Sequence, residues 1–491
     1  MSAFQQLLDH SQKVSHFEHL SAIVGWDQAA VMPSGGAEAR SNAMAELSVH
    51  IHSLMTQPRL GDLFAKAEEE NLSVEQSAVL REMKRDWQQA NLLPESLVQA
   101  QSLAGSKCEH AWRTQRGNND WQGFEKNWAE VVTLSREEAQ IRAEAKGVSA
   151  YNAMLDIYEP GTTTASLDQL FSDVKTWLPS MIDQAIEKQA SGQIQLPNGH
   201  YPAEKQKALG LDVMKLLQFD FEHGRLDESV HPFCGGVPSD VRITTRYDEK
   251  EFVQSLMGIV HETGHARYEQ GLPKAFAGTS AGQARSMGIH ESQSLFFEMQ
   301  LGRSPAFVDH LAQLATNYFQ GNEFNADNLA KIYTRVEKGY IRVDADELTY
   351  PAHVILRYEI ERDLMNGVIK HTDVPELWNE KMKSYLGLST EGNYKNGCMQ
   401  DIHWTDGSFG YFPSYTLGAM YAAQFMASMR KTVDVDKAIK EGDLSPIFIW
   451  LHDNIWSKGS LLTTDELVRS ATGETLNSEH FKAHLKSRYL R

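Results

Sequence analysis

The chain has 491 residues, of which 41% are hydrophobic and 23% are charged, and its formal net charge is −18 at pH 7. This composition is ordinary for a globular protein and excludes a disordered chain, a collagen-like repeat and a disulfide scaffold. The negative net charge argues against nucleic acid as a partner, because phosphate binding requires clustered basic residues.

The first segment, MSAFQQLLDHSQKVSHFEHLSAIVGWD, alternates polar and apolar residues and lacks the basic start and apolar run of a secretory signal. No segment offers about 18 consecutive apolar residues, as a membrane span would require. The three cysteines, Cys108, Cys234 and Cys398, are widely spaced and contain no CxxC pair. We therefore expect buried or partly buried thiols and a cytoplasmic protein that binds no membrane.

Residues 1–190 are predicted to form a succession of amphipathic helices with few prolines. One of them is TASLDQLFSDVKTWLPSMIDQAIEKQ, whose apolar residues recur every three or four positions. The residues on this apolar stripe are Leu167, Leu170, Phe171, Val174 and Leu178.

Residues 190–250 differ from the helical region before them. QIQLPNGHYP carries turn signals, HPFCGGVPSD is typical of a Gly/Pro connector, and VRITTRY is β-branched enough to predict a short strand. This strand precedes the next predicted helix, EFVQSLMGIVHETGHARYEQG. An exposed strand edge beside that helix would be able to hold an extended peptide through backbone hydrogen bonds.

That helix contains the run HETGH. Residues four apart share one face of a helix, so His261 and His265 are able to bind a single Zn²⁺ while Glu262 reaches a water on the metal. Two imidazoles and a carboxylate on a buried helix would be costly without a partner such as a metal ion. The apolar residues that predict burial of this helix are Phe252, Leu256, Ile259 and Val260.

The following segment, QGLPKAFAGTSAGQARSMG, is rich in Gly, Ala and Ser and predicts a mobile loop, without the pattern of a phosphate-binding loop. Helical patterns then continue to the C-terminus. Since no repeat or linker is evident, we predict a mainly α protein with a small β-sheet beside the HETGH helix. Residues 1–491 form a single domain in this prediction, with a helical N-terminal part (1–190) and a catalytic part (191–491).

A catalytic zinc site has three protein ligands and one open position, so HETGH needs a third ligand. The metzincin pattern requires glycine and histidine at two positions where this chain has Tyr268 and Gly271. The alternative is a glutamate on a following helix, and IHESQSLFFEMQL offers Glu291, 26 residues after His265. Glu298 of the same segment competes, but we expect it on a solvated helix face.

Such a site suits peptide hydrolysis. Zn²⁺ with two neutral imidazoles and one carboxylate keeps a positive charge that acidifies its water and polarises a carbonyl. Glu262 then takes a proton as the water attacks and passes it to the leaving amine.

Six short motifs occur in order along the chain: HPF at 231–233, DVRIT at 240–244, HETGH at 261–265, HESQ at 290–293, IRVDAD at 341–346 and GCMQDIHW at 397–404. With them, and with GWDQAAVMPSGGAEAR at 25–40, the chain resembles the carboxypeptidase Taq family of zinc metallocarboxypeptidases along its whole length. The resemblance implies that His261, His265 and Glu291 are the zinc ligands and Glu262 the catalytic base. These are the four residues that the spacing indicates.

The resemblance also implies a saddle-like, mostly helical subunit of gluzincin type with a deep groove, commonly a homodimer. One Zn²⁺ per subunit is expected, with Co²⁺ as a substitute. The expected substrates are peptides with a free C-terminal carboxylate, from which single residues are removed with broad specificity but poor tolerance of proline. Two alternatives stay open: a zinc oligopeptidase or dipeptidyl carboxypeptidase with the same site, and a metal-stabilised helical binding protein without catalysis.

Release of the last residue requires recognition of a free carboxylate, which a guanidinium binds through two parallel hydrogen bonds. The leading candidate is Arg342 in IRVDAD. Arg242 in DVRIT comes next, with an ion pair to Asp240 as the equal alternative. Arg357 is weaker, because a salt bridge to Glu361, four residues later on a helix, explains it.

The oxyanion of the tetrahedral intermediate needs a hydrogen-bond donor, and we expect Tyr415, with His403 as a second donor near the scissile bond. Tyr411 is a candidate substrate contact, although aromatic residues here are also expected in the core. For His231 and His290, packing or turn roles are expected. The candidates for carboxylates that orient the metal-binding imidazoles are Asp344, Asp346 and Asp401.

Overall fold

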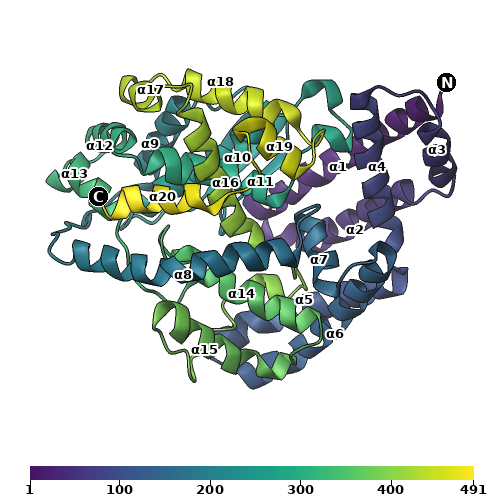
Figure 1. The fold of residues 1–491 in the computed structure, drawn as a ribbon, viewed down its shortest axis with the longest axis horizontal. Coiled ribbons are helices and arrows are strands. Elements are labelled where there is room, and N and C mark those ends of the chain that lie inside the picture. Colours follow the sequence, from purple (N-terminus) through teal and green to yellow (C-terminus); the bar gives the residue numbers. More distant parts are fainter.

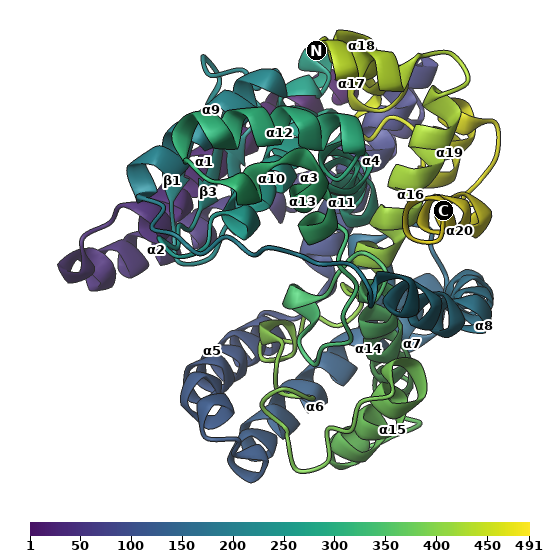
Figure 2. The ribbon, with the colours of Figure 1, turned by 90° about the vertical axis from the view of Figure 1, so that its left-hand side faces the viewer.

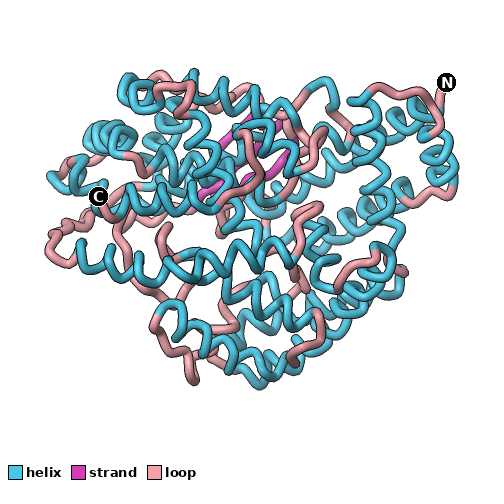
Figure 3. Tube along the Cα trace, in the orientation of Figure 1, coloured by secondary structure: helices cyan, strands magenta, loops and turns pink.

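The computed structural model describes residues 1–491, and α-helices make up most of it, as Figures 1 and 3 show. The predicted succession of N-terminal helices is confirmed. Several of these helices begin at a capping side chain, such as Ser73, which forms a capping box with Gln76. They are α1 (Ala3–Ala30), α2 (Ala37–Met55), α3 (Arg59–Glu68), α4 (Val74–Leu92), α5 (Glu95–Gly117), α6 (Trp121–Lys146), α7 (Ala150–Tyr158) and α8 (Thr164–Gln189).

The remainder of the chain is also mainly helical, which confirms the predicted fold class. The HETGH segment lies in α10, as its periodicity predicts, and a π-helical turn, η4 (Phe296–Gly302), directly follows α11. The helices are α9 (Ala203–Leu216), α10 (Val253–Gly271), α11 (Met287–Leu295), α12 (Pro305–Tyr318), α13 (Ala326–Tyr333), α14 (Tyr350–Met365), α15 (Val374–Leu386), α16 (Pro413–Met429), α17 (Val435–Glu441), α18 (Ser445–Asn454), α19 (Thr464–Thr472) and α20 (Ser478–Tyr489).

A single three-stranded sheet precedes α10 and is formed by β1 (Gly224–Glu228), β2 (Cys234–Val237) and β3 (Asp240–Thr245). The predicted strand, β3, is central: it pairs in parallel with β1 and antiparallel with β2. The expectation that this strand offers a free edge is therefore wrong, because both of its edges are hydrogen-bonded. The supposed connector HPFCGGVPSD contributes β2, and Gly236 turns it with a φ of +86°, which favours glycine.

The segment between α10 and α11 is packed against the N-terminal helices, contrary to the prediction of a mobile loop. It forms two short turns, η2 (Lys274–Phe276) and η3 (Ser280–Gly282), and the Ala281 side chain is fully buried. The guanidinium of Arg285 lies 3.1 Å from the carboxylate of Glu82 on α4, and both side chains are buried. This buried ion pair joins the segment to α4. The small residues of the segment gave no indication of this contact.

Figure 2 shows two helical halves that diverge from the side where α8 and α16 lie. One half contains the sheet with α1 and α9 to α12, and the other contains α5, α6, α14 and α15. A cavity of about 940 Å³ is lined on one side by α10 and α11 and on the other by residues 342–350 and the start of α16. This cavity matches the predicted groove.

None of the helices combines the length and apolar character needed to cross a membrane. The three cysteines are free thiols, of which Cys108 and Cys398 are buried and Cys234 is half-buried, as predicted. The largest apolar core runs from Ala104 to Tyr489 in the sequence. The assignment of residues 1–491 to a single domain stays a prediction.

Candidate metal centre

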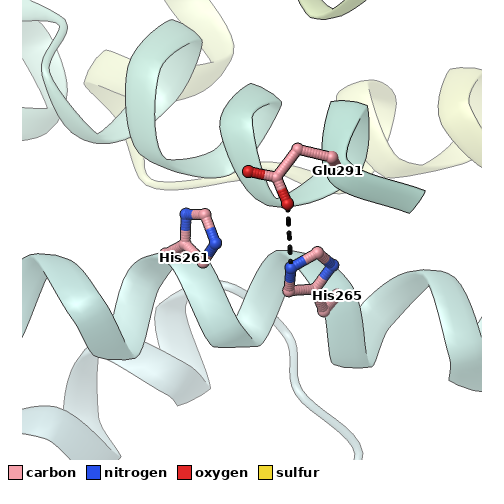
Figure 4. Close-up of side chains that lie close together, drawn as sticks. All are labelled: His261, His265 and Glu291. Carbon is pink, nitrogen blue, oxygen red and sulfur yellow. Dashed lines mark ion pairs between the residues drawn. The ribbon is translucent and has the colours of Figure 1, made fainter. Parts of the chain in front are cut away.

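Helix α10 places both histidines of HETGH on the side that faces α11, where Glu291 lies (Figure 4). The two helices approach closely because HETGH contains a glycine. A Cβ atom on Gly264 would lie 2.6 Å from the backbone oxygen of Gln293 in α11. Gly418 of α16 has a similar role, since its Cβ would lie 2.7 Å from the side chain of Glu291. Small residues thus allow three helices to meet at the site.

The side chains of His261, His265 and Glu291 fit a metal ion. One ligand atom from each residue lies within 4.8 Å of the others, and His265 Nε2 is 3.4 Å from Glu291 Oε2. Two donors at about 2.0–2.1 Å from a tetrahedral Zn²⁺ lie about 3.4 Å from each other. The predicted ligand set is therefore brought together as a possible metal site, and one of its pairs has the spacing that suits a zinc ion.

Glu298 fixes the orientation of the His261 ring, because Nδ1 of His261 donates to Glu298 Oε2 at 2.7 Å. Its side chain is only 14% exposed, so the expectation of a solvated helix face is wrong. Glu298 lies in the π-helical turn that follows α11, and its carboxylate reaches His261 of α10. Although burial alone would raise the pKa of Glu298, Arg303 and His261 hold it at about 2. The resulting carboxylate leaves His261 Nε2 free for a metal.

His265 has a corresponding partner in His290. Their Nδ1 atoms lie 2.6 Å apart, and His290 Nε2 lies 2.8 Å from the carboxylate of Glu269. Burial lowers the pKa of His265 to about 4, so its imidazole is neutral. With the proton on Nδ1, the lone pair of Nε2 is available to a metal ion. His290 therefore orients the ring of a candidate metal ligand, which is more than the packing role expected of it. His231 is exposed in the connection between β1 and β2.

Glu262 lies beside these groups in the cavity wall. Its side chain is buried, and Oε2 has no hydrogen-bond partner in the protein. Burial raises the pKa of this carboxyl to about 7. An unpartnered buried carboxylate oxygen carries a desolvation cost, and it is positioned to accept a proton from water in the cavity.

Arg342 lies in the opposite wall, within η6 (Arg342–Asp344), and is 5% exposed. Its Nε donates to Asp401 at 2.9 Å, and one Nη donates to the hydroxyl of Tyr350 at 2.9 Å. The guanidinium carbon is 4.9 Å from the centre of the Tyr415 ring. The second Nη atom of Arg342 donates to neither Asp401 nor Tyr350, so its N–H groups are available to a ligand.

Arg357 is fully buried behind this wall. Its Nε donates at 2.7 Å to the second carboxylate oxygen of Asp401, so Asp401 joins the two arginines. The expected salt bridge from Arg357 to Glu361 is wrong, because the Glu361 oxygens accept hydrogen bonds from other groups. These are the Tyr151 hydroxyl, the Trp404 indole and the Gly410 amide.

None of the three aspartates proposed as orienting groups reaches a metal-binding imidazole, so this prediction is wrong. Asp401 pairs with arginines, and Asp346 accepts the backbone N–H groups of Leu348 and Thr349. Asp344 lines the cavity without a hydrogen bond to its carboxylate. Glu298 and His290 take the orienting role, and the seven-residue spacing from Glu291 was the signal for Glu298.

Arg242 lies outside the cavity lining. Its guanidinium forms two hydrogen bonds with Asp240, at 2.9 and 2.7 Å, and lies 4.6 Å from the centre of the Trp26 ring. The structure therefore favours the ion-pair alternative over substrate binding.

Tyr411 and Tyr415 both line the cavity. The hydroxyl of Tyr415 lies 3.2 Å from Nε2 of His403, whose ring is half-buried. Burial lowers the pKa of His403 to about 4, so the ring is neutral near pH 7. The pair is able to present a hydroxyl donor to the cavity, and its catalytic role stays a prediction.

Three comparisons place this geometry among known proteins. The model of the family described as "Carboxypeptidase Taq (M32) metallopeptidase" matches residues 6–489. Thermostable carboxypeptidase 1 of Thermus thermophilus is 36% identical over 99% of this chain and 98% of that protein. Carboxypeptidase 1 of Bacillus subtilis is 34% identical over 99% and 97%. The structure of metallocarboxypeptidase 1 of Trypanosoma cruzi has a TM-score of 0.98 at 48% identity, covering 100% and 99%.

Proposed function

Because the chain belongs to the carboxypeptidase Taq (M32) family of metallopeptidases and is thus a hydrolase, we propose that it is a zinc-dependent carboxypeptidase that releases single C-terminal residues. One observation carries the proposal. Three donors that suit Zn²⁺ and the free carboxylate oxygen of Glu262 converge at one wall of a cavity, and an arginine lies in the opposite wall.

His261, His265 and Glu291 would hold the ion. Bound there, Zn²⁺ supplies a Lewis acid that polarises the scissile carbonyl and acidifies water. Glu262 accepts a proton from the attacking water and donates it to the leaving amine. Its raised pKa suits a group that must both take and return a proton near neutral pH.

Arg342 would select the end of the peptide. A guanidinium held by Asp401 and Tyr350 offers its remaining N–H groups in a fixed direction, which favours a planar carboxylate. Tyr415, with His403 behind it, would donate to the oxyanion, and Tyr411 would contact the substrate from the same wall. A peptide without a free C-terminus would lose the arginine contact.

The cavity volume of about 940 Å³ supports broad specificity, since side chains of many sizes would fit. Proline at the cleaved bond would be poorly accepted, because it lacks a backbone N–H and fixes φ. The family resemblance supports a homodimer with one Zn²⁺ per subunit, replaceable by Co²⁺. Three free thiols suit the reducing cytoplasm as the site of action.

The test uses N-blocked dipeptides and the same peptides with an amidated C-terminus. The proposal expects hydrolysis of the free acids and little hydrolysis of the amides. Equal rates of hydrolysis on the free acids and on the amides would contradict the proposal that the enzyme is an exopeptidase. The masses of products from longer peptides separate release of one residue from release of two, which is the expectation for a dipeptidyl carboxypeptidase.

A further inference from the structure

The carboxylates that line the cavity beyond the metal centre are mostly engaged by the protein itself. Glu251 accepts the backbone N–H of Val253 at 2.7 Å. Asp346 accepts the N–H groups of Leu348 and Thr349 at 2.9 and 3.0 Å. These two carboxylates stabilise local turns, so they have little remaining capacity for a substrate.

The cations of the cavity wall are also engaged. Arg303 pairs with Glu298, Arg342 pairs with Asp401, and Arg335 pairs with Glu337 at 3.2 Å. Asp344 is the exception among the charged groups beyond the metal centre: its carboxylate lines the cavity, is exposed, and forms no hydrogen bond or ion pair. Asp344 therefore leaves an unpaired carboxylate at this wall of the cavity.

The position of this charge relative to Arg342 is fixed by a tight turn. Both residues belong to η6, whose rise of about 2 Å per residue places their backbones within one side-chain length of each other. Val343 lies between them, is 67% exposed and also lines the cavity. A peptide whose terminal carboxylate binds Arg342 would extend its last side chain over an apolar residue toward a free carboxylate.

We propose, on the basis of the function proposed above, that Asp344 favours lysine and arginine as the released residue. The methylene groups of such a side chain would pack on Val343, and its cationic head would face the Asp344 carboxylate. Neutral side chains remain substrates, and acidic ones are disfavoured by like charge. Asp344 is thus a specificity-determining residue within a broad range of substrates.

The experiment compares three N-acylated dipeptides that end in lysine, norleucine or glutamate. In the wild-type enzyme we expect kcat/KM to fall in that order. In Asp344→Asn, the lysine-to-norleucine ratio of kcat/KM should fall by about fivefold, the size of an exposed ion pair. The rate on norleucine should change less than the rate on lysine, and Asp344→Lys should favour glutamate over lysine.

The matched control is Asp309→Asn on α12, an exposed aspartate outside this cavity that also has no ion pair. It should leave all three rates unchanged. Higher salt should reduce the lysine preference of the wild-type enzyme but not that of Asp344→Asn, because salt screens exposed charges.

An unchanged lysine-to-norleucine ratio in Asp344→Asn would overturn the inference, and so would an equal loss on all three substrates, which indicates a structural role. Failure of the proposed function looks different. In that case the wild-type enzyme would release no C-terminal residue from any of the three free acids, and the inference would fall with it.

Discussion

The two walls of the cavity are built in different ways. The metal wall takes its donors from residues 261–291, on two neighbouring helices that meet through glycine. The opposite wall contains Arg342, whose partners Asp401 and Tyr415 lie at least 59 residues further along the chain. The first wall is therefore a product of helical periodicity, and the second is a product of tertiary folding.

The two walls also differ in how far their polar groups are satisfied. At the metal wall, one nitrogen of each histidine is engaged by the protein, and the other nitrogen and Glu262 Oε2 face the cavity. In the opposite wall, Arg342 already has two protein partners. Changes to the metal wall should thus act on the chemical step or on metal binding, and changes to Arg342 on KM.

The largest expected effect comes from Glu262→Gln. The amide has nearly the same shape but accepts no proton, so kcat on an N-blocked dipeptide should fall by about 10³-fold. The metal content, measured by atomic absorption, should stay at the wild-type level because the ligands are untouched. Retention of more than about a tenth of kcat would exclude Glu262 as the general base.

Glu298→Gln should weaken the metal wall without removing a ligand. Loss of the charge behind His261 reduces the basicity of its other nitrogen, and the dissociation constant for Zn²⁺ should rise by about 10- to 100-fold. Competition with a chelator measures this constant. Glu269→Gln is the control, since it acts on His265 only through His290 and should have a smaller effect. Equal affinities of Glu298→Gln and the wild type would contradict the orienting role.

Arg342→Lys tests the opposite wall. Lysine keeps the charge but loses the planar fork, and the loss of one charged hydrogen bond should raise KM for free-acid peptides by about tenfold. The kcat value should change little. A large fall in kcat with unchanged KM would instead place Arg342 in the chemical step.

The smallest effect is expected for Arg242→Lys, because Arg242 pairs with Asp240 outside the cavity. Its kinetic constants should match those of the wild type, and the free energy of unfolding should fall by less than about 1 kcal/mol. A rise in KM like that of Arg342→Lys would show that the sequence motif DVRIT contributes to substrate binding after all.

Much of the metal wall could be predicted from the chain. The spacing in HETGH and the failure of the metzincin pattern indicated His261, His265 and Glu291, which the structure brings together. The position of Glu298 beside the site had a sequence signal, since seven residues after Glu291 equal two turns of an expected α-helix. Its charged side chain nevertheless favoured a solvated face. The role of His290 at His265 depended on the packing of α10 against α11.

The sequence by itself determined the helices, the fold class and the candidate metal ligands, because these follow from patterns within one or two neighbouring helices. Only the tertiary structure decided which arginine faces the cavity. Arg242, Arg342 and Arg357 look alike as residue types, and their ion pairs are formed with Asp240 and Asp401 by strand geometry and by long-range packing. Asp401 is distant in sequence from Arg342 and Arg357, so no local sequence pattern predicts these ion pairs, and only the folded structure identifies them.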